Sequence, residues 1–212
     1  MTERLQGTHA LVPLKEPDRG KSRLGSVLRA VERERLVVTM LADVTACLAR
    51  VADIRSVSVL TRAAALLPRG CVHVPDRGRD LNVEIASAAR ELQGAGARAM
   101  LVLPADIPFV TPEDILALLT ASRDAPVVAA PDWTETGTNA LLLAPPLLIP
   151  THFGPGSLAA HEAAARDAGV SLRRVSRPGL GCDIDEPQQL AMLLEKGGPR
   201  YAFLAHTPRQ VF

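Results

Sequence analysis

The sequence predicts a single α/β domain with a doubly wound, mostly parallel sheet, arranged as a Rossmann-type three-layer sandwich. Short apolar runs alternate along the chain with segments of helical periodicity. Such runs are typical of strands buried on both faces, and a repeated strand–helix order implies right-handed parallel crossovers. The length of 212 residues is ordinary for one domain of this class.

The predicted strands are the short apolar runs at 9–12, 57–60, 72–74, 100–103 and 127–130. Between the first two, apolar residues recur at helical spacing from Leu36 to Leu48, which predicts a long amphipathic helix. Further helices are predicted over 81–92, 112–122 and 157–168, and a last one through Leu194. We expect Asp185 to cap that last helix, because an early-helix proline, Pro187, follows it.

We expect residues 1–196 to form the domain and residues 197–212 to form a C-terminal tail. From Gly197 onward the apolar residues lack periodicity, which predicts a segment that is loose or docks on a neighbour. Three apolar residues of this tail, Phe203, Leu204 and Phe212, could pack across a homodimer.

Composition narrows the classes of function. A net charge of +1 gives no reason to expect a nucleic-acid partner. No apolar run approaches the roughly 20 residues that span a bilayer, and the N-terminus lacks the apolar core of a signal peptide, so we expect a cytoplasmic protein without a membrane partner. Cys47, Cys71 and Cys182 are widely spaced, which fits neither a disulfide framework nor a zinc site, and we expect reduced thiols.

Two acidic segments and a basic loop predict a magnesium-dependent nucleotide site. Asp106 follows a predicted strand, and Asp183 and Asp185 stand two residues apart, so in an extended segment their side chains share a face. Such hard oxygen ligands favour Mg²⁺ over zinc. The loop after the first predicted strand carries cations that could hold phosphates, namely Lys15, Arg19, Lys21 and Arg23.

Simpler readings of these residues stay open. The basic loop could be a solvated surface turn, and Asp106 could cap a helix or shape a turn between two prolines. Residues 137–141 could form a turn into an antiparallel strand. Other nucleotide motifs fail: Lys15 stands where a P-loop would place its first glycine, and the glycines at 94 and 96 follow a helix instead of a strand. Ser157 and His161 lie on one predicted helix without a nucleophile elbow.

Together, the motifs resemble the phosphoenolpyruvate or 2-phospho-L-lactate guanylyltransferase family of deazaflavin coenzyme biosynthesis. The resemblance runs from about residue 9 to 195 and rests on the motifs 11–15, 21–24, 104–108, 137–141, 153–157 and 183–185. The family is similar to the nucleotidyltransferases that include molybdopterin guanylyltransferase. This implies a fold like that of nucleotide-diphospho-sugar transferases.

The resemblance implies roles for particular residues. It implies nucleotide contacts for Leu11, Pro13, Lys15, Lys21 and Asn82. It implies catalytic roles for Lys15, Lys21, Arg23 and Asp106. It implies acceptor contacts for Thr138, Asn139, Gly154, Gly156 and Ser157. It implies Mg²⁺ ligation by Asp106, Asp183 and Asp185.

The implied reaction joins GMP from GTP to a three-carbon phosphoacid with release of pyrophosphate. The acceptor remains open among phosphoenolpyruvate, phospholactate and phosphoglycerate, and the preference for guanine rests on the resemblance. One alternative is another nucleotidyltransferase of this fold, with a molybdopterin or sugar-phosphate acceptor. The other is a non-catalytic nucleotide-binding protein.

Overall fold

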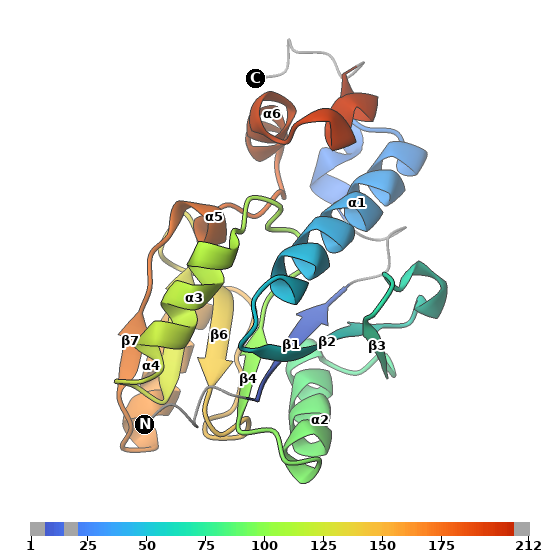
Figure 1. Ribbon diagram of the computed structural model, residues 1–212. Helices are drawn as coiled ribbons and strands as arrows, with labels where there is room; N and C mark the ends of the chain where they lie inside the picture. The colour runs from blue at the N-terminus through green and yellow to red at the C-terminus, as the bar shows by residue number, and fades with distance from the viewer. Residues whose placement is uncertain (1–6, 15–20, 206–212) are drawn as a thin grey trace.

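The protein is built around one seven-stranded sheet, ordered β3-β2-β1-β4-β6-β5-β7. A computed structural model describes residues 7–14 and 21–205 (Figure 1). The strands are β1 (Thr8–Pro13), β2 (Ile54–Thr61), β3 (Val72–Pro75), β4 (Ala99–Val102), β5 (Val127–Pro131), β6 (Thr138–Leu143) and β7 (Leu172–Arg174). Only β6 among them runs against its neighbours, pairing antiparallel with β4 and β5.

Helices cover both faces of this sheet. The α-helices are α1 (Ala30–Ala49), α2 (Leu81–Gly94), α3 (Pro112–Ala121), α4 (Ser157–Asp167), α5 (Pro178–Gly181) and α6 (Pro187–Lys196). Short 3-10 helices are η1 (Ser22–Ser26), η2 (Ala64–Leu66) and η3 (Pro199–Leu204). In one core cluster α1 and α3 pack on the sheet, whereas α2 and α4 belong to a second cluster.

Alternation along the strands divides the core between these clusters. In β1, Ala10 and Val12 face the α1 side, whereas Leu11 faces the α2 side. All three side chains are fully buried, as expected for a central strand covered on both faces. The predicted α/β class, single domain and mostly parallel sheet are therefore confirmed.

Local signals in the sequence explain where several helices begin. At α3, Thr111 and Asp114 form a reciprocal capping box and Pro112 occupies the first turn. At α2 the Asp80 carboxylate accepts a hydrogen bond from the backbone N–H of Asn82. The predicted cap of α6 was one residue early, because Glu186 occupies the N-cap position and Pro187 begins the helix.

The segment predicted as a tail contributes to a third core cluster. Tyr201 and Leu204 of η3 are almost fully buried and pack with Leu36 and Met40 of α1. The Tyr201 hydroxyl also donates to Asp43 Oδ2 at 2.7 Å. Figure 1 shows η3 and α6 beside α1, so the described part of this segment, up to Ala205, packs on its own chain instead of lying loose. Phe212 lies outside the described residues.

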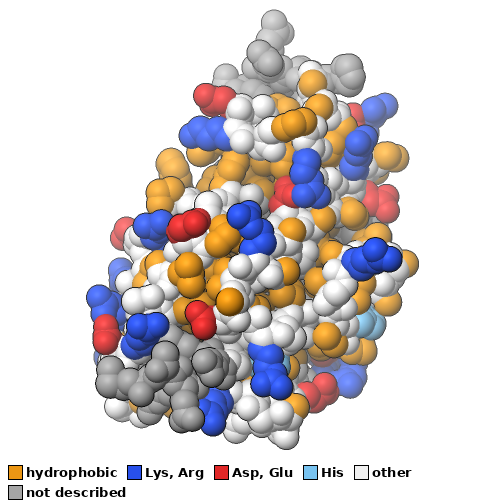
Figure 2. All heavy atoms as spheres, in the orientation of Figure 1, with side chains coloured by type: hydrophobic (Ala, Val, Ile, Leu, Met, Phe, Trp, Pro, Cys, Tyr) orange, Lys and Arg blue, Asp and Glu red, His pale blue; other side chains and the backbone are white. Residues whose placement is uncertain are grey.

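The surface carries mixed charge. On the face in Figure 2, blue Lys and Arg side chains are interspersed with red Asp and Glu side chains. Within the described ranges, none of the helices has the length and apolarity needed to cross a membrane. Cys47, Cys71 and Cys182 are free thiols.

Candidate active site

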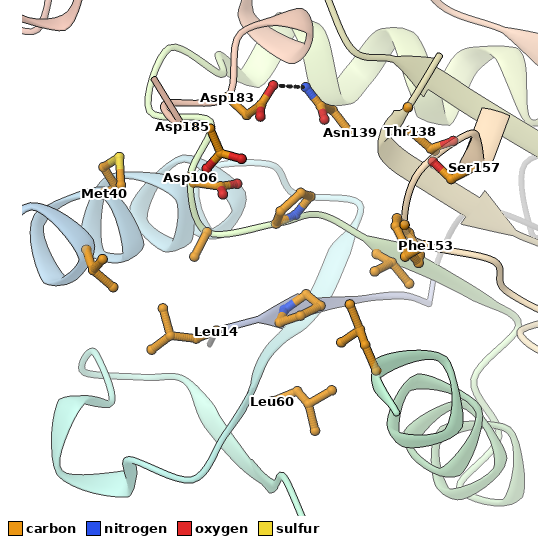
Figure 3. A pocket seen from close by; sticks show the side chains of 18 of the residues that line it. Leu14, Met40, Leu60, Asp106, Thr138, Asn139, Phe153, Ser157, Asp183 and Asp185 are labelled. Carbon is orange, nitrogen blue, oxygen red and sulfur yellow. Dashed lines mark hydrogen bonds between the residues drawn. The ribbon is translucent and has the colours of Figure 1, made fainter. Parts of the chain in front are cut away.

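A cavity of about 690 Å³ opens at the carboxyl ends of the parallel strands. The loops after β1, β3 and β4 line it, as is usual for α/β sheets. Because β6 is antiparallel, its amino-terminal end reaches the same edge and brings Thr138 and Asn139 into the lining. The site therefore combines residues from both halves of the chain, as Figure 3 shows.

One wall of the cavity holds an acidic cluster formed by Asp106, Asp183 and Asp185 (Figure 3). The backbone N–H of Ile184 donates to the Asp106 carbonyl oxygen at 3.0 Å. This bond joins two segments that lie far apart in the sequence. It explains how the predicted metal ligands come together.

Lys21 lies between two of these carboxylates. Its ammonium group contacts Asp106 Oδ2 at 2.6 Å and Asp185 Oδ1 at 2.5 Å. Burial alone would lower the pKa of Lys21, but the two carboxylates outweigh that effect, and the pKa is raised above its ordinary value. The lysine is therefore a fixed positive charge at the acidic cluster.

The backbone of Lys21 also occupies an unusual conformation. Its φ of 57° lies in the left-handed region, which a residue with a Cβ seldom adopts. The side chain is only 7% exposed. The two ion pairs are contacts that hold the residue in this place.

Asp183 has a different set of partners. Asn139 Nδ2 donates to Asp183 Oδ1 at 3.3 Å and to the Leu180 carbonyl oxygen at 2.9 Å. Burial, followed by the negative charge of Asp106, raises the pKa of Asp183. Asp183 and Asp185 both line the cavity, and within the acidic cluster Asp106 and Asp185 share the ammonium group of Lys21.

The opposite wall carries hydroxyl groups and a helix N-terminus. Thr138 and Ser157 lie side by side in Figure 3, and both line the cavity. Ser157 is the first residue of α4, where oriented backbone N–H groups favour an anion. The preceding turn uses Gly154 and Gly156, whose φ values of 140° and 69° suit glycine.

Asn82 lies behind this wall and fixes its loop. Its Nδ2 donates to the Phe153 carbonyl oxygen at 3.0 Å, and its Oδ1 accepts the Phe153 backbone N–H at 2.7 Å. Both ends of the amide are therefore engaged by the chain itself. The structure gives Asn82 a contact with the loop before α4.

The remaining predicted residues are placed as follows. Pro13 and Arg23 line the cavity, whereas Leu11 is a core residue and Gly156 is an exposed residue of the turn before Ser157. Arg23 reaches the rim, with Nη1 3.5 Å from Glu186 Oε1. Lys15 and Arg19 lie outside the described residues.

Sequence reasoning missed a polar wall after β3, formed by Asp76, Arg79 and Glu84. Arg79 Nε and Nη2 donate to Glu84 Oε1 and Oε2 at 2.9 and 2.8 Å. These bonds lower the pKa of Glu84 to about 2 against the opposing effect of burial. Asp76 directly follows a strand, which is the signal that could have located this wall.

His161 was considered from the sequence but was not predicted to be a site residue. Its ring lies behind Thr138, with Nδ1 3.1 Å from the Thr138 hydroxyl.

The described residues contain no group of three or more His, Cys, Asp or Glu side chains arranged to hold a metal ion.

Comparison of the sequence with known families gives one match across nearly the whole chain. Residues 8–205 match the family model described as guanylyl transferase CofC like. A phosphoenolpyruvate guanylyltransferase from Rubrobacter xylanophilus is 41% identical over 91% of this chain and 96% of its own. The enzyme of the same name from Chloroflexus aggregans is 38% identical over 84% of this chain and 93% of its own.

Solved structures agree on the fold. A protein of Desulfovibrio desulfuricans G20 described as a nucleotide-diphospho-sugar transferase superposes with a TM-score of 0.78, covering 93% of this chain and 94% of its own at 19% identity. A CMP:2-keto-3-deoxy-manno-octonic acid synthetase complexed with CTP has a TM-score of 0.61 at 13% identity, covering 94% and 98%. At these identities the likeness is one of architecture.

Proposed function

We propose that this chain, which belongs to the CofC-like guanylyl transferase family, joins GMP from GTP to phosphoenolpyruvate and releases pyrophosphate. Membership makes the chain a nucleotidyltransferase. The choice of phosphoenolpyruvate is supported by the names of relatives that are 34 to 41% identical over most of the chain. Because both substrates are intracellular metabolites, the proposal includes a cytoplasmic step of coenzyme biosynthesis.

One observation carries the proposal. A single cavity has an acidic cluster with a buried lysine on one wall and hydroxyl groups at a helix N-terminus on the other. The first wall suits a triphosphate with its counter-cation, and the second suits the anionic groups of a small acid. Leu14 and Leu60, which also line the cavity, supply an apolar surface for the nucleoside.

The proposed reaction is an in-line displacement at the α-phosphorus of GTP. An oxygen of the acceptor phosphate forms the new P–O bond, and the bond to pyrophosphate breaks with its electron pair leaving on pyrophosphate. A phosphate monoester has a second pKa of about 6, so the nucleophile is already largely ionised at neutral pH. The reaction therefore needs no general base, and the main task is to align two anions.

We include Mg²⁺ in this proposal because the donors fit it. Mg²⁺ usually takes one or two carboxylates and completes its shell with water and substrate phosphate oxygens. A cage of three protein side chains is therefore not required, and Asp106 and Asp185 already converge on one cationic group. Asp106 and Asp185 would hold the ion, with Asp183 adding negative charge beside them, and the ion would offset charge on the phosphate oxygens.

The chain's own cations would act beside these carboxylates. Lys21 sits at the acidic wall, where its ammonium group can turn from the carboxylates to phosphate oxygens of GTP. Arg23 lies at the rim and is largely exposed, so it can meet the leaving pyrophosphate. Thr138 and Ser157 would hold the acceptor on the far side.

The test is a reaction with a panel of acceptors. Purified protein, Mg²⁺ and GTP are incubated in turn with phosphoenolpyruvate, phospholactate and phosphoglycerate, and pyrophosphate release and product mass are followed. We expect a guanylylated product with phosphoenolpyruvate and slower reaction with the others. GTP binding without any product would contradict the proposal, and a product with another acceptor alone would reassign the substrate.

A further inference from the structure

His161 is a buried side chain behind the acceptor wall, which is the side of the cavity formed by Thr138 and Ser157. It lies on α4, its relative exposure is 0%, and the Phe153 ring contacts it edge-on with centroids 5.3 Å apart. Its two ring nitrogens have different partners. The backbone N–H of His152 donates to Nε2 at 2.9 Å, and Nδ1 lies 3.1 Å from Thr138 Oγ1.

These two contacts fix the tautomer of the ring. A nitrogen that accepts a hydrogen bond carries no proton, so Nε2 is the bare nitrogen. A neutral imidazole carries its single proton on the other nitrogen, so Nδ1–H donates to the Thr138 oxygen. Burial, followed by the nearby His152, lowers the pKa of His161 to about 4, which keeps the ring neutral at physiological pH.

The tautomer in turn sets the direction of the Thr138 hydroxyl. Because its oxygen accepts from His161, its own proton is left for a partner in the cavity that Thr138 lines. A hydroxyl directed in this way is a donor for an oxyanion. Without the histidine the hydroxyl could rotate and present a lone pair to an incoming carboxylate or phosphate oxygen.

We propose that His161 is a positioning residue that makes Thr138 a committed hydrogen-bond donor to an oxyanion of the acceptor. The inference rests on the proposed function, because it concerns the three-carbon acid that would occupy this wall. His161 itself touches no substrate. His161 contributes to acceptor binding. It does not affect nucleotide binding at the acidic cluster and Lys21, which lie across the cavity.

The kinetic test compares His161→Phe, Thr138→Val and the double variant. Each single change removes the directed donor, so we expect the KM for phosphoenolpyruvate to rise roughly tenfold, the worth of one hydrogen bond to a charged group. We expect the KM for GTP to stay within about twofold, and the double variant to be no worse than either single one, as for groups acting as one unit. The proposal would be overturned if His161→Phe left the acceptor KM unchanged, or if the increases in acceptor KM of the two single variants added up in the double variant.

A matched control uses the neighbouring histidine. His152 has an exposed side chain and contributes to the network through its backbone N–H. His152→Gln keeps that N–H, so we expect the acceptor KM to remain close to that of the parent protein. If His152→Gln raised the acceptor KM as much as His161→Phe does, the effect would come from a general disturbance of the loop, and the proposal would be overturned.

A direct measurement covers the case in which His161→Phe fails to fold. Nitrogen-15 NMR of the unaltered protein at pH 7 distinguishes the two neutral tautomers and the cation of His161. We expect the neutral form protonated at Nδ1, and either of the other forms would overturn the proposal. Because this readout needs no turnover, it separates failure of the inference from failure of the proposed function, which would show as absence of product in the unaltered protein.

Discussion

Lys21 has a constrained environment among the charged residues that line the cavity. It is buried, lies in the left-handed backbone region, and neutralises two of the proposed metal ligands. An ammonium group between two carboxylates is what this wall requires when no other cation is bound, because two like charges close together raise each other's energy. Nucleotide and Mg²⁺ would take over that neutralisation.

The carboxylate of Asp106 gives the first prediction. Asp106→Asn keeps the size of the side chain but removes its charge, so we expect kcat/KM to fall by at least about a hundredfold, as for loss of an electrostatic group at a reacting phosphate. Thermal unfolding should shift by only a few degrees. Near-normal turnover, measured by pyrophosphate release, would remove Asp106 from the catalytic site.

The ammonium group of Lys21 gives the second prediction. Lys21→Met should reduce the free energy of unfolding by about 2 kcal/mol, less than the 3–5 kcal/mol of a fully buried pair, because Asp185 is 45% exposed. The two carboxylates then lose the positive charge of the Lys21 ammonium group. We therefore expect Mg²⁺ alone to raise the Tm of Lys21→Met more than it raises the Tm of the parent protein.

A thermal-shift titration with Mg²⁺ checks this expectation, with Arg23→Met as the control. In the described part of the chain, the ion pair of Arg23 is with the exposed Glu186 at 3.5 Å and not with the acidic cluster, so its removal leaves the ion pairs between Lys21 and the cluster in place. If Mg²⁺ stabilised Lys21→Met and the parent protein equally, the carboxylates would not form the Mg²⁺ site.

At the scale of elements, Asn82 connects α2 to the loop before α4. Asn82→Ala removes two hydrogen bonds to the Phe153 backbone, each worth about 1 kcal/mol. We expect a loss of about 1–2 kcal/mol in the free energy of unfolding. We also expect a higher KM for the acceptor, because Gly154 follows in the same loop and Ser157 begins the helix after it. Hydrogen exchange at residues 152–157 should become faster.

Asn82→Asp is the matched control for this loop. It keeps an acceptor for the Phe153 N–H but loses the donor to the carbonyl oxygen, so an intermediate acceptor KM is expected. If both variants changed the KM for GTP while the KM for the acceptor stayed the same, Asn82 would instead belong to the nucleoside site, as the family resemblance implies.

The polar wall after β3, which contains Arg79 and Glu84, gives a prediction about the pH dependence of stability. Hydrogen bonds from Arg79 hold the pKa of Glu84 at about 2, whereas an unfolded glutamate titrates near about 4.3. A lowered carboxyl pKa stabilises the folded state fully above the unfolded value, and this stabilisation disappears as the pH falls toward the folded value. Glu84→Gln should therefore be less stable than the parent protein at pH 7.

Urea unfolding at several pH values checks this. The difference in unfolding free energy between the parent protein and Glu84→Gln should shrink steadily between pH 4.5 and 2. A difference that stayed constant over this range would show that the Arg79–Glu84 pair is not the source of the stabilisation.

The longer helices and the central strands could be read from the sequence because their signals are local. The periodicity of α1 and the capping box of α3 each lie within a short window. A turn into an antiparallel strand was one reading of residues 137–141, and the pairing of β6 with β4 and β5 confirms it. The three-residue strand β7 is too short to carry a pattern, and η3 is held by packing against α1.

At the scale of the whole molecule, the sequence predicted that Asp106, Lys21 and Thr138 belong to one site, because carboxyl ends of strands meet at one edge and because of the family resemblance. The structure places all three in the lining of one cavity. The actual partners, such as Lys21 between Asp106 and Asp185, depend on side-chain geometry across more than 80 residues of sequence and could not be read from spacing. Arg79 and Glu84 were missed because no familiar motif contains them.

The central claim is that this cavity joins GMP to phosphoenolpyruvate. Its most direct test is phosphorus-31 NMR of one sample containing the protein, Mg²⁺, GTP and phosphoenolpyruvate, with Asp106→Asn in a parallel sample. We predict that the parent protein converts the phosphate signal of phosphoenolpyruvate into a pair of coupled diphosphate signals while pyrophosphate appears in equal amount. Loss of GTP without a coupled pair, or equal conversion by Asp106→Asn, would contradict the account.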